Sequence, residues 1–285
     1  MITFTALGQY GRLGNQLFQY AILLVVGAKR GYEIKISLLN NKYWHGQKCL
    51  LNNFNITAKE LTTDDLIKHE YIEKEVDYFK YNPEIFNIQD NTNIFGFFQN
   101  YQYYKNHENL IIRELTPKDE IIQKNKEILL KIKEKYPDYL IVSLHIRRGD
   151  TKLTMYGNEN ILDVNSKWFQ YFSRAKKIFE GKKCKFLVFT GGNRTTDDPT
   201  SDYIWCKNNL KTDEYIYWKY ENTTINDFTL MYLSDAHILS PISSLSWWIG
   251  FLNKNNNKII VSPEKYRFLE EKMEDGFYPP NFILK

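Results

Sequence analysis

YLIVSLHIRRGD, residues 139–150, is the stretch that decides the fold. An uncharged, mostly apolar run that ends at His145 is typical of a buried strand, and charged side chains follow at its carboxyl end. Alternation along a strand puts His145 and Arg147 on one face and Arg148 on the other. We therefore expect Arg147 to contact a ligand and Arg148 to hold Asp150 or a neighbouring loop. A structural cluster of ion pairs would explain the same residues without a ligand.

Strand and helix patterns alternate from this point to the carboxyl end of the chain. Helices are predicted over residues 166–179, 203–209, 225–234 and 243–252, and strands over residues 185–190, 214–218, 237–240 and 258–262. Strands and helices that alternate at this spacing predict a doubly wound parallel sheet. Ligands of such sheets bind outside the carboxyl ends of the strands, so we expect the functional residues to follow strands directly.

GRLGNQLFQYA, residues 11–21, places glycine, arginine and amide side chains where a helix begins in the first half of the chain. The patterns around it predict a βαβ unit made of residues 2–7, 17–28 and 32–36. A long amphipathic helix is predicted over residues 117–136, and it stops at Pro137. We place the boundary between two domains after this proline.

Length and composition favour two domains. A chain of 285 residues with 43% apolar residues exceeds the usual size of one domain, so we expect α/β domains over residues 1–137 and 138–285. The net charge of +4 is scattered and does not indicate a nucleic-acid partner. Three cysteines without CxxC spacing predict neither a disulfide framework nor a zinc site. Without a leader pattern or a bilayer-spanning run, we expect a cytoplasmic protein with at most peripheral membrane association.

SPISSLSWWIGFL, residues 240–252, offers a second anion site. Ser243 or Ser244 stands where a helix N-cap belongs, so amides and hydroxyls would point toward the strand ends. Simple N-capping explains the same serines without a ligand. Asp227 begins the preceding helix, where a carboxylate either caps the helix and complements its dipole or accepts the N–H groups of a guanine ring.

Three motifs in this order, GRLGNQLFQYA, HIRRGD and SSLSWW, resemble those of glycosyltransferase family 11, the α-1,2-fucosyltransferases, over most of the chain. The resemblance implies a GT-B-like fold, in which two Rossmann-like domains face each other and the second binds GDP-β-L-fucose. It also implies that fucose is transferred to the 2-hydroxyl of a terminal galactoside with inversion at the anomeric carbon. No cofactor and no metal ion would be required.

The resemblance further assigns roles to donor-side residues. By its match to the arginine motif, Arg147 would hold the β-phosphate of the donor, with His145 and Arg148 nearby. Asp227 occupies a place comparable to a guanine-reading acid. The phosphate-side serines of the family match Ser243 and Ser244.

Catalysis would then depend on charge stabilisation. We expect Arg147 and the helix start at Ser243 to stabilise the departing GDP. Asp150 is the candidate base, with Glu159 in reserve. The first domain would form the other rim of the cleft, beside a galactose-terminated acceptor, with Gly11, Gly14, Asn15 and Gln16.

Two other classes of protein fit the same residues. A catalytically silent protein would bind GDP or a galactoside in the same cleft and release no GDP from GDP-fucose. A transferase with another nucleotide-sugar donor and a divalent metal would lose its activity in EDTA.

Overall fold

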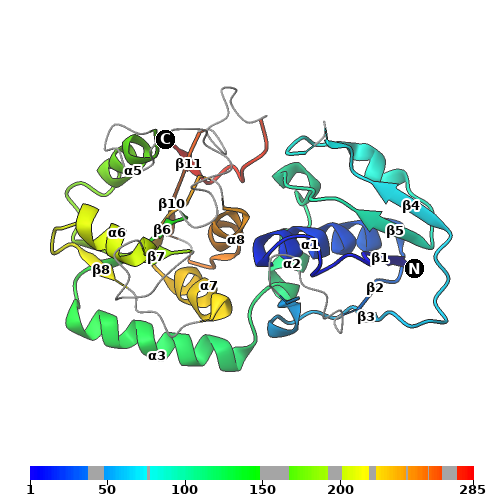
Figure 1. Ribbon diagram of the computed structural model, residues 1–285, viewed down its shortest axis with the longest axis horizontal. Coiled ribbons are helices and arrows are strands. Elements are labelled where there is room, and N and C mark those ends of the chain that lie inside the picture. Colours follow the sequence, from blue (N-terminus) through cyan, green and yellow to red (C-terminus); the bar gives the residue numbers. More distant parts are fainter. Residues whose placement is uncertain are drawn as a thin grey trace. The chain divides into compact units, whose positions relative to one another are not determined.

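The computed structural model describes residues 1–37, 48–75, 78–147, 167–191, 201–217, 223–241, 243–255, 257–264 and 275–285. The chain divides into two compact units (Figure 1). Unit 1 comprises Met1–Asp119 and Glu274–Pro280, and unit 2 comprises Glu120–Met273 and Asn281–Lys285. The division therefore falls after the first residue of the long helix, whereas the predicted boundary lies beyond its end, at residue 137.

Side-chain contacts explain why the long helix, α3 (Asp119–Lys135), belongs with unit 2. Asn125 Nδ2 donates a hydrogen bond to Asn226 Oδ1 at 3.3 Å. Lys133 Nζ lies 2.6 Å from Asp235 Oδ1, and the other oxygen of that carboxylate accepts the N–H of Ile141 at 2.9 Å. The partners stand about a hundred positions away in the chain, so the helix pattern by itself did not reveal them.

Unit 2 is built on a six-stranded parallel sheet with the order β11-β10-β9-β6-β7-β8. Its strands are β6 (Leu140–Ile146), β7 (Cys184–Thr190), β8 (Tyr215–Tyr217), β9 (Ala236–Ile238), β10 (Ile259–Ser262) and β11 (Ile283–Leu284). The helices between them are α5 (Lys167–Lys177), α6 (Asp202–Asn209), α7 (Thr224–Leu233) and α8 (Ser244–Leu252). The predicted doubly wound sheet is confirmed, and β11 is added to it.

The direction of each connection decides which face of this sheet a helix covers. The steps from β6 to β7 and from β7 to β8 run toward one edge, so right-handed crossovers place α5 and α6 on one face (Figure 1). The steps from β8 to β9 and from β9 to β10 run the other way, and α7 and α8 cover the opposite face. Leu144 and Ile146 of β6 belong to the core cluster under α5, together with Tyr171 and Ala175.

Unit 1 contains a three-stranded parallel sheet with the order β1-β5-β4 and a parallel pair, β2-β3. Its elements are β1 (Ile2–Thr3), α1 (Leu13–Arg30), β2 (Lys35–Ile36), β3 (Lys59–Glu60), β4 (His69–Ile72), β5 (Thr92–Phe95) and α2 (Glu108–Glu114), with 3₁₀ turns at Leu51–Asn53, Pro83–Asn87 and Tyr101–Tyr103. The predicted βαβ unit is present, because Ile2 forms a parallel bridge with Ile34 across α1.

The first strand is shorter than the sequence predicts. The N–H of Leu7 donates to the carbonyl of Phe4 at 3.0 Å, so the chain turns where residues 2–7 were predicted to stay extended. Helix α1 then lies buried along most of its length and ends at Gly31, whose φ of 70° is left-handed. Within the described residues, no helix has both the length and the apolar character that crossing a membrane requires.

Candidate functional site

Strand β6 brings His145 and Arg147 to the carboxyl edge of the sheet in unit 2. His145 is buried and Arg147 is half-buried. The His145 ring faces α8, because its Nδ1 lies 2.5 Å from the hydroxyl oxygen of Ser246. Leu144 and Ile146 face the opposite side, toward α5, as alternation along a strand predicts.

Three buried serines connect this strand end to the first turn of α8. Ser240 Oγ accepts the backbone N–H of Arg147 at 3.2 Å, and Ser246 Oγ accepts the backbone N–H of Ser240 at 3.2 Å. Ser243 is the N-cap of α8 and accepts the backbone N–H of Ser246 at 3.3 Å. Sequence reasoning identified Ser243 and missed the other two serines. Their spacing of three residues in SPISSLS was the signal that could have found them.

Two further predicted residues, Ser244 and Asp227, lie in the first turns of α8 and α7. Ser244 is the first residue of α8 and is half-buried. Asp227 lies in the first turn of α7 and is 4% exposed. The N-cap of α7 is Thr223, whose side chain accepts the N–H of Asn226, so the interpretation of Asp227 as a cap is wrong. Its carboxylate still complements the positive end of the helix dipole.

Three predicted residues, Arg148, Asp150 and Glu159, lie outside the described residues. Their roles stay predictions. In the part of the chain that the structure does describe, no three His, Cys, Asp or Glu side chains come together as metal ligands would.

A second buried histidine, His237, lies on the same face of the sheet as His145. Its Nδ1 is 2.7 Å from Ser143 Oγ, and its Nε2 is 2.6 Å from the Asn253 amide nitrogen. An amide nitrogen only donates, so Nε2 accepts and the ring proton sits on Nδ1. Burial lowers the pKa of His237 to about 3, and the charge of Lys258 acts in the same direction. His237 is therefore neutral at pH 7 and links β6, β9 and the end of α8.

In unit 1, the first turn of α1 meets the turn that follows β5. Asn15 Oδ1 accepts a hydrogen bond from Gln99 Nε2 at 2.9 Å. Gly11 has a φ of 101°, and a Cβ there would lie 2.4 Å from Asn15 Nδ2. Glycine at position 11 is therefore required by the close approach of Asn15, which is half-buried at this end of the sheet.

Gly14 and Gln16 are both buried in the first turn of α1. Gln16 Nε2 donates to the carbonyl of Lys48 at 3.1 Å, and Gln16 Oε1 accepts the N–H of Leu50 at 2.9 Å. The side chain thus attaches residues 48–50 to the helix, a structural task that the sequence did not predict.

A buried carboxylate shapes the turn that carries Gln99. Glu73, from the end of β4, is 4% exposed and accepts the N–H groups of Phe97 at 2.6 Å and Phe98 at 3.1 Å. Gly96 has a φ of 154°, and a Cβ there would lie 2.5 Å from the Cβ of Glu73. The turn after β5 therefore depends on Gly96 and Glu73 together.

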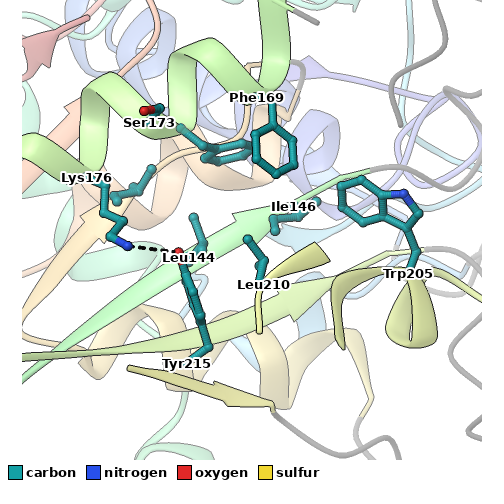
Figure 2. Close-up of a pocket in the computed structure, with 10 residues that line it drawn as sticks. Leu144, Ile146, Phe169, Ser173, Lys176, Trp205, Leu210 and Tyr215 are labelled. Atoms are coloured by element: carbon teal, nitrogen blue, oxygen red, sulfur yellow. Dashed lines mark hydrogen bonds between the residues drawn. The ribbon is translucent and has the colours of Figure 1, made fainter. Parts of the chain in front are cut away.

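Figure 2 shows a hollow between α5, α6 and the sheet of unit 2. Its volume is about 180 Å³, and it is lined by Leu144, Ile146, Phe169, Phe172, Ser173, Lys176, Trp205, Leu210, Tyr215 and Ile238. At one end Lys176 Nζ donates to Tyr215 Oη at 3.3 Å and pairs with Glu214. Because Leu144 and Ile146 line it, this hollow lies on the face of the sheet opposite to His145.

Comparison with known proteins identifies the class of this α/β protein. The chain matches glycosyl transferase family 11 over residues 2–283 and belongs to that family. It is a glycosyltransferase, and the family predicted from the three motifs is confirmed.

Two curated relatives come from Escherichia coli. One is the O-antigen biosynthesis glycosyltransferase WbnK, 22% identical over 296 residues, which cover 90% of this chain and 92% of the relative. The other is an alpha-1,2-colitosyltransferase, 25% identical over 295 residues, which cover 92% of this chain and 91% of the relative.

The fold is similar to that of POFUT1, solved in complex with GDP. One crystal form aligns with a TM-score of 0.56 at 11% identity and covers 92% of this chain and 97% of POFUT1. A high-resolution structure of the same complex aligns with a TM-score of 0.51 at 12% identity. These alignments confirm the predicted α/β, GT-B-like fold class.

Proposed function

We propose that this glycosyltransferase moves L-fucose from GDP-β-L-fucose to the 2-hydroxyl of a terminal galactoside, with inversion at the anomeric carbon. The observation that carries the proposal is the position of Arg147, which is half-buried at the carboxyl end of β6. Its backbone N–H donates to Ser240 Oγ, and Ser240 lies between β9 and the start of α8. A guanidinium group suits bidentate contact with a diphosphate, and a helix start favours an anion. The relative named as an alpha-1,2-colitosyltransferase supports the linkage, and the GDP bound to POFUT1 supports the nucleotide.

The proposed mechanism depends on stabilising the leaving group. Negative charge develops on the GDP as the bond between the anomeric carbon and the β-phosphate oxygen breaks. Arg147, with Arg148 nearby, and the amides at the start of α8 would stabilise that charge without a metal ion. The 2-hydroxyl of the acceptor attacks the opposite face of the sugar and loses its proton late in the reaction. Asp150 is our candidate for this base, with Glu159 in reserve.

The remaining predicted residues divide between the two substrates. We propose that Asp227 contacts the guanine ring, and that Ser243 and Ser244 lie on the phosphate side. Asn15 is the best candidate for an acceptor contact, because it is half-buried, whereas the Gln16 amide is occupied by backbone groups. We propose Gly14 as an acceptor-side residue on its match to the first motif alone, because it is buried in the first turn of α1.

The test is incubation of the purified protein with GDP-fucose and a panel of terminal β-galactosides, followed by mass spectrometry and linkage analysis. We expect one added deoxyhexose at the 2-position of galactose, with activity that persists in EDTA. Arg147→Ala should lower kcat/KM at least about 100-fold, the usual cost of losing one group that stabilises transition-state charge. Arg174→Ala, at an exposed position of α5, is the matched control and should leave kcat/KM unchanged. Near-normal turnover by Arg147→Ala would refute the proposed clamp.

A second donor is suggested by the name of one relative. Colitose lacks the 3-hydroxyl of fucose, so GDP-colitose should be assayed in parallel. Faster transfer of colitose would reassign the donor and leave the proposed linkage in place. Calorimetric binding of GDP without transfer of either sugar would instead favour a catalytically silent binding protein.

A further inference from the structure

The hollow between α5, α6 and the sheet of unit 2 has the volume and the lining of a site for a small molecule. Its volume is about 180 Å³, and an apolar cavity of about 150 Å³ in an engineered protein takes up benzene. The floor is made of Leu144 and Ile146 of β6 and Ile238 of β9, which are all buried. Ser173 of α5 also lines the hollow and is exposed, so the hollow reaches the protein surface.

The helices on either side of the hollow are attached to the sheet, which opposes closure of the empty space. In α5, the Tyr171 hydroxyl oxygen lies 2.8 Å from the carbonyl oxygen of Leu239 and 3.0 Å from that of Val261. At the end of α6, the carbonyl of Leu210 accepts the hydroxyl proton of Tyr217 from β8. Side chains around a void that does not close lack contact atoms on one side, so a ligand that supplies these atoms gains dispersion energy.

The polar end of the hollow holds a cation whose charge is already balanced. Lys176 Nζ forms an ion pair with Glu214 and donates to Tyr215 Oη at 3.3 Å. These contacts use two of the three N–H groups of the ammonium, so the third can donate to a further acceptor. A charged ligand would bring an unpaired charge into an otherwise apolar space, whereas a neutral carbonyl oxygen can accept this N–H without that cost.

We propose that the hollow binds a neutral molecule with one aromatic ring and one hydrogen-bond acceptor, with the acceptor beside Lys176. Figure 2 shows Lys176 at one end of the hollow and Trp205 at the other. Phe169 of α5 and Trp205 of α6 form an edge-to-face pair, with ring centroids 6.4 Å apart and an interplanar angle of 77°. Aromatic rings at this end offer a ring of the ligand both faces and edges to pack against.

The volume and the position of the hollow separate this site from the proposed donor site. Pockets for drug-sized ligands usually have at least about 300 Å³, so the hollow is too small for a sugar nucleotide. It also lies on the face of the sheet opposite to His145. The proposed ligand is therefore a different molecule from either substrate of the proposed transfer.

The test is a titration of the whole protein with acetophenone, which has one ring and one carbonyl group, followed by amide NMR spectra. We expect saturable shifts in α5, α6 and the strands beneath them, with a Kd of about 1 mM or lower. Benzoate brings a charge, and 2-octanone brings a flexible chain that must be ordered. Each should bind at least about tenfold more weakly than acetophenone.

A variant of Lys176 tests where the acceptor lies. Lys176→Met should raise the Kd for acetophenone about tenfold, the size expected for one hydrogen bond to a charged group. The same variant should leave the Kd for toluene, which has a ring but no acceptor, unchanged. Equal effects on the two ligands would contradict an acceptor beside Lys176.

Two phenylalanine variants test where the ring lies. Leu210→Phe places a ring in the hollow and should raise the Kd for acetophenone at least about tenfold. Leu187→Phe is the matched control, because Leu187 lies between Phe186 and Val188, which face α5, and therefore points to the opposite face of the sheet. It should leave the Kd unchanged.

Three results would overturn the proposal: no saturable shifts with acetophenone, equal losses of affinity in Leu210→Phe and Leu187→Phe, or tighter binding of benzoate or 2-octanone than of acetophenone. The comparison of ligands uses the wild-type protein, so it decides the outcome even if a variant fails to fold.

Discussion

Acidification from pH 7 to about pH 4.5 is expected to destabilise unit 2 through His237. Burial lowers the pKa of this residue to about 3 in the folded protein, whereas an unfolded histidine titrates near 6.5. Between these pH values the unfolded chain binds one more proton than the folded chain, so stability falls as the pH drops below 6.5. Two pH units below the unfolded pKa correspond to about 2.7 kcal/mol of unfolding free energy.

Urea unfolding monitored by tryptophan fluorescence measures this effect, because five of the six tryptophans lie between residues 120 and 273. His237→Gln removes the titrating group and keeps a side chain that forms hydrogen bonds. Between pH 7 and about pH 4.5, the wild-type protein should lose about 2.7 kcal/mol more than this variant. Paired carboxylates also make the protein less stable in acid; for example, Lys35 lowers the pKa of Asp65 to about 2. These carboxylates contribute equally to the wild-type protein and to His237→Gln.

A matched variant separates titration of His237 from damage to its surroundings. Ser143→Ala removes one hydrogen bond but keeps the buried imidazole, so it should retain the steep pH dependence of the wild-type protein. Equal losses of stability in the wild-type protein and His237→Gln would refute the reasoning.

Two stability predictions follow from the packing of each unit. Gly96→Ala should destabilise unit 1 by about 3 kcal/mol, because the new Cβ would lie 2.5 Å from the Cβ of Glu73. Gly181→Ala has open space around the new Cβ and should cost only about 1 kcal/mol. Circular dichroism during urea unfolding compares them, and equal costs would contradict the predicted clash. Leu210→Phe should partly fill the hollow of Figure 2 and stabilise unit 2 by about 0.5–1 kcal/mol, whereas Leu187→Phe, in a filled core, should destabilise it by at least about 1 kcal/mol. Urea unfolding followed by tryptophan fluorescence measures the stability of both variants. If both were more stable than the wild-type protein, the effect could not be attributed to filling the hollow.

The central strands of unit 2 could be predicted because they are buried apolar runs separated by helices of ordinary length. β3 and β11 could not, since each has two residues with exposed side chains and no periodicity to detect. The predicted boundary at residue 137 differs from the observed division for another reason. The pattern of an amphipathic helix shows that one of its faces is buried, but it does not show which unit buries that face. The partners of the helix, such as Asp235, decide this.

In the candidate site, too, local features could be predicted from the sequence and contacts between distant segments could not. Ser243 followed from local capping rules. The partner of Ser246 is His145 in β6, 101 positions away, and the partner of Ser240 is Arg147, directly after β6 and 93 positions away. Gln16 illustrates the opposite case. Its polar side chain at a helix start suggested a substrate contact, but the amide bonds to backbone groups of Lys48 and Leu50, which no local pattern reveals.

The carboxyl-terminal segment determines how the two units can be exchanged between relatives. Residues 275–280 belong to unit 1, where the carbonyl of Phe277 accepts the N–H of Tyr101 at 3.1 Å, and the last strand then returns to pair with β10. A chimera joined at one point would therefore leave either unit incomplete. A transplant of unit 1 has to carry Met1–Asp119 and Glu274–Pro280 together, with β11 left in the recipient.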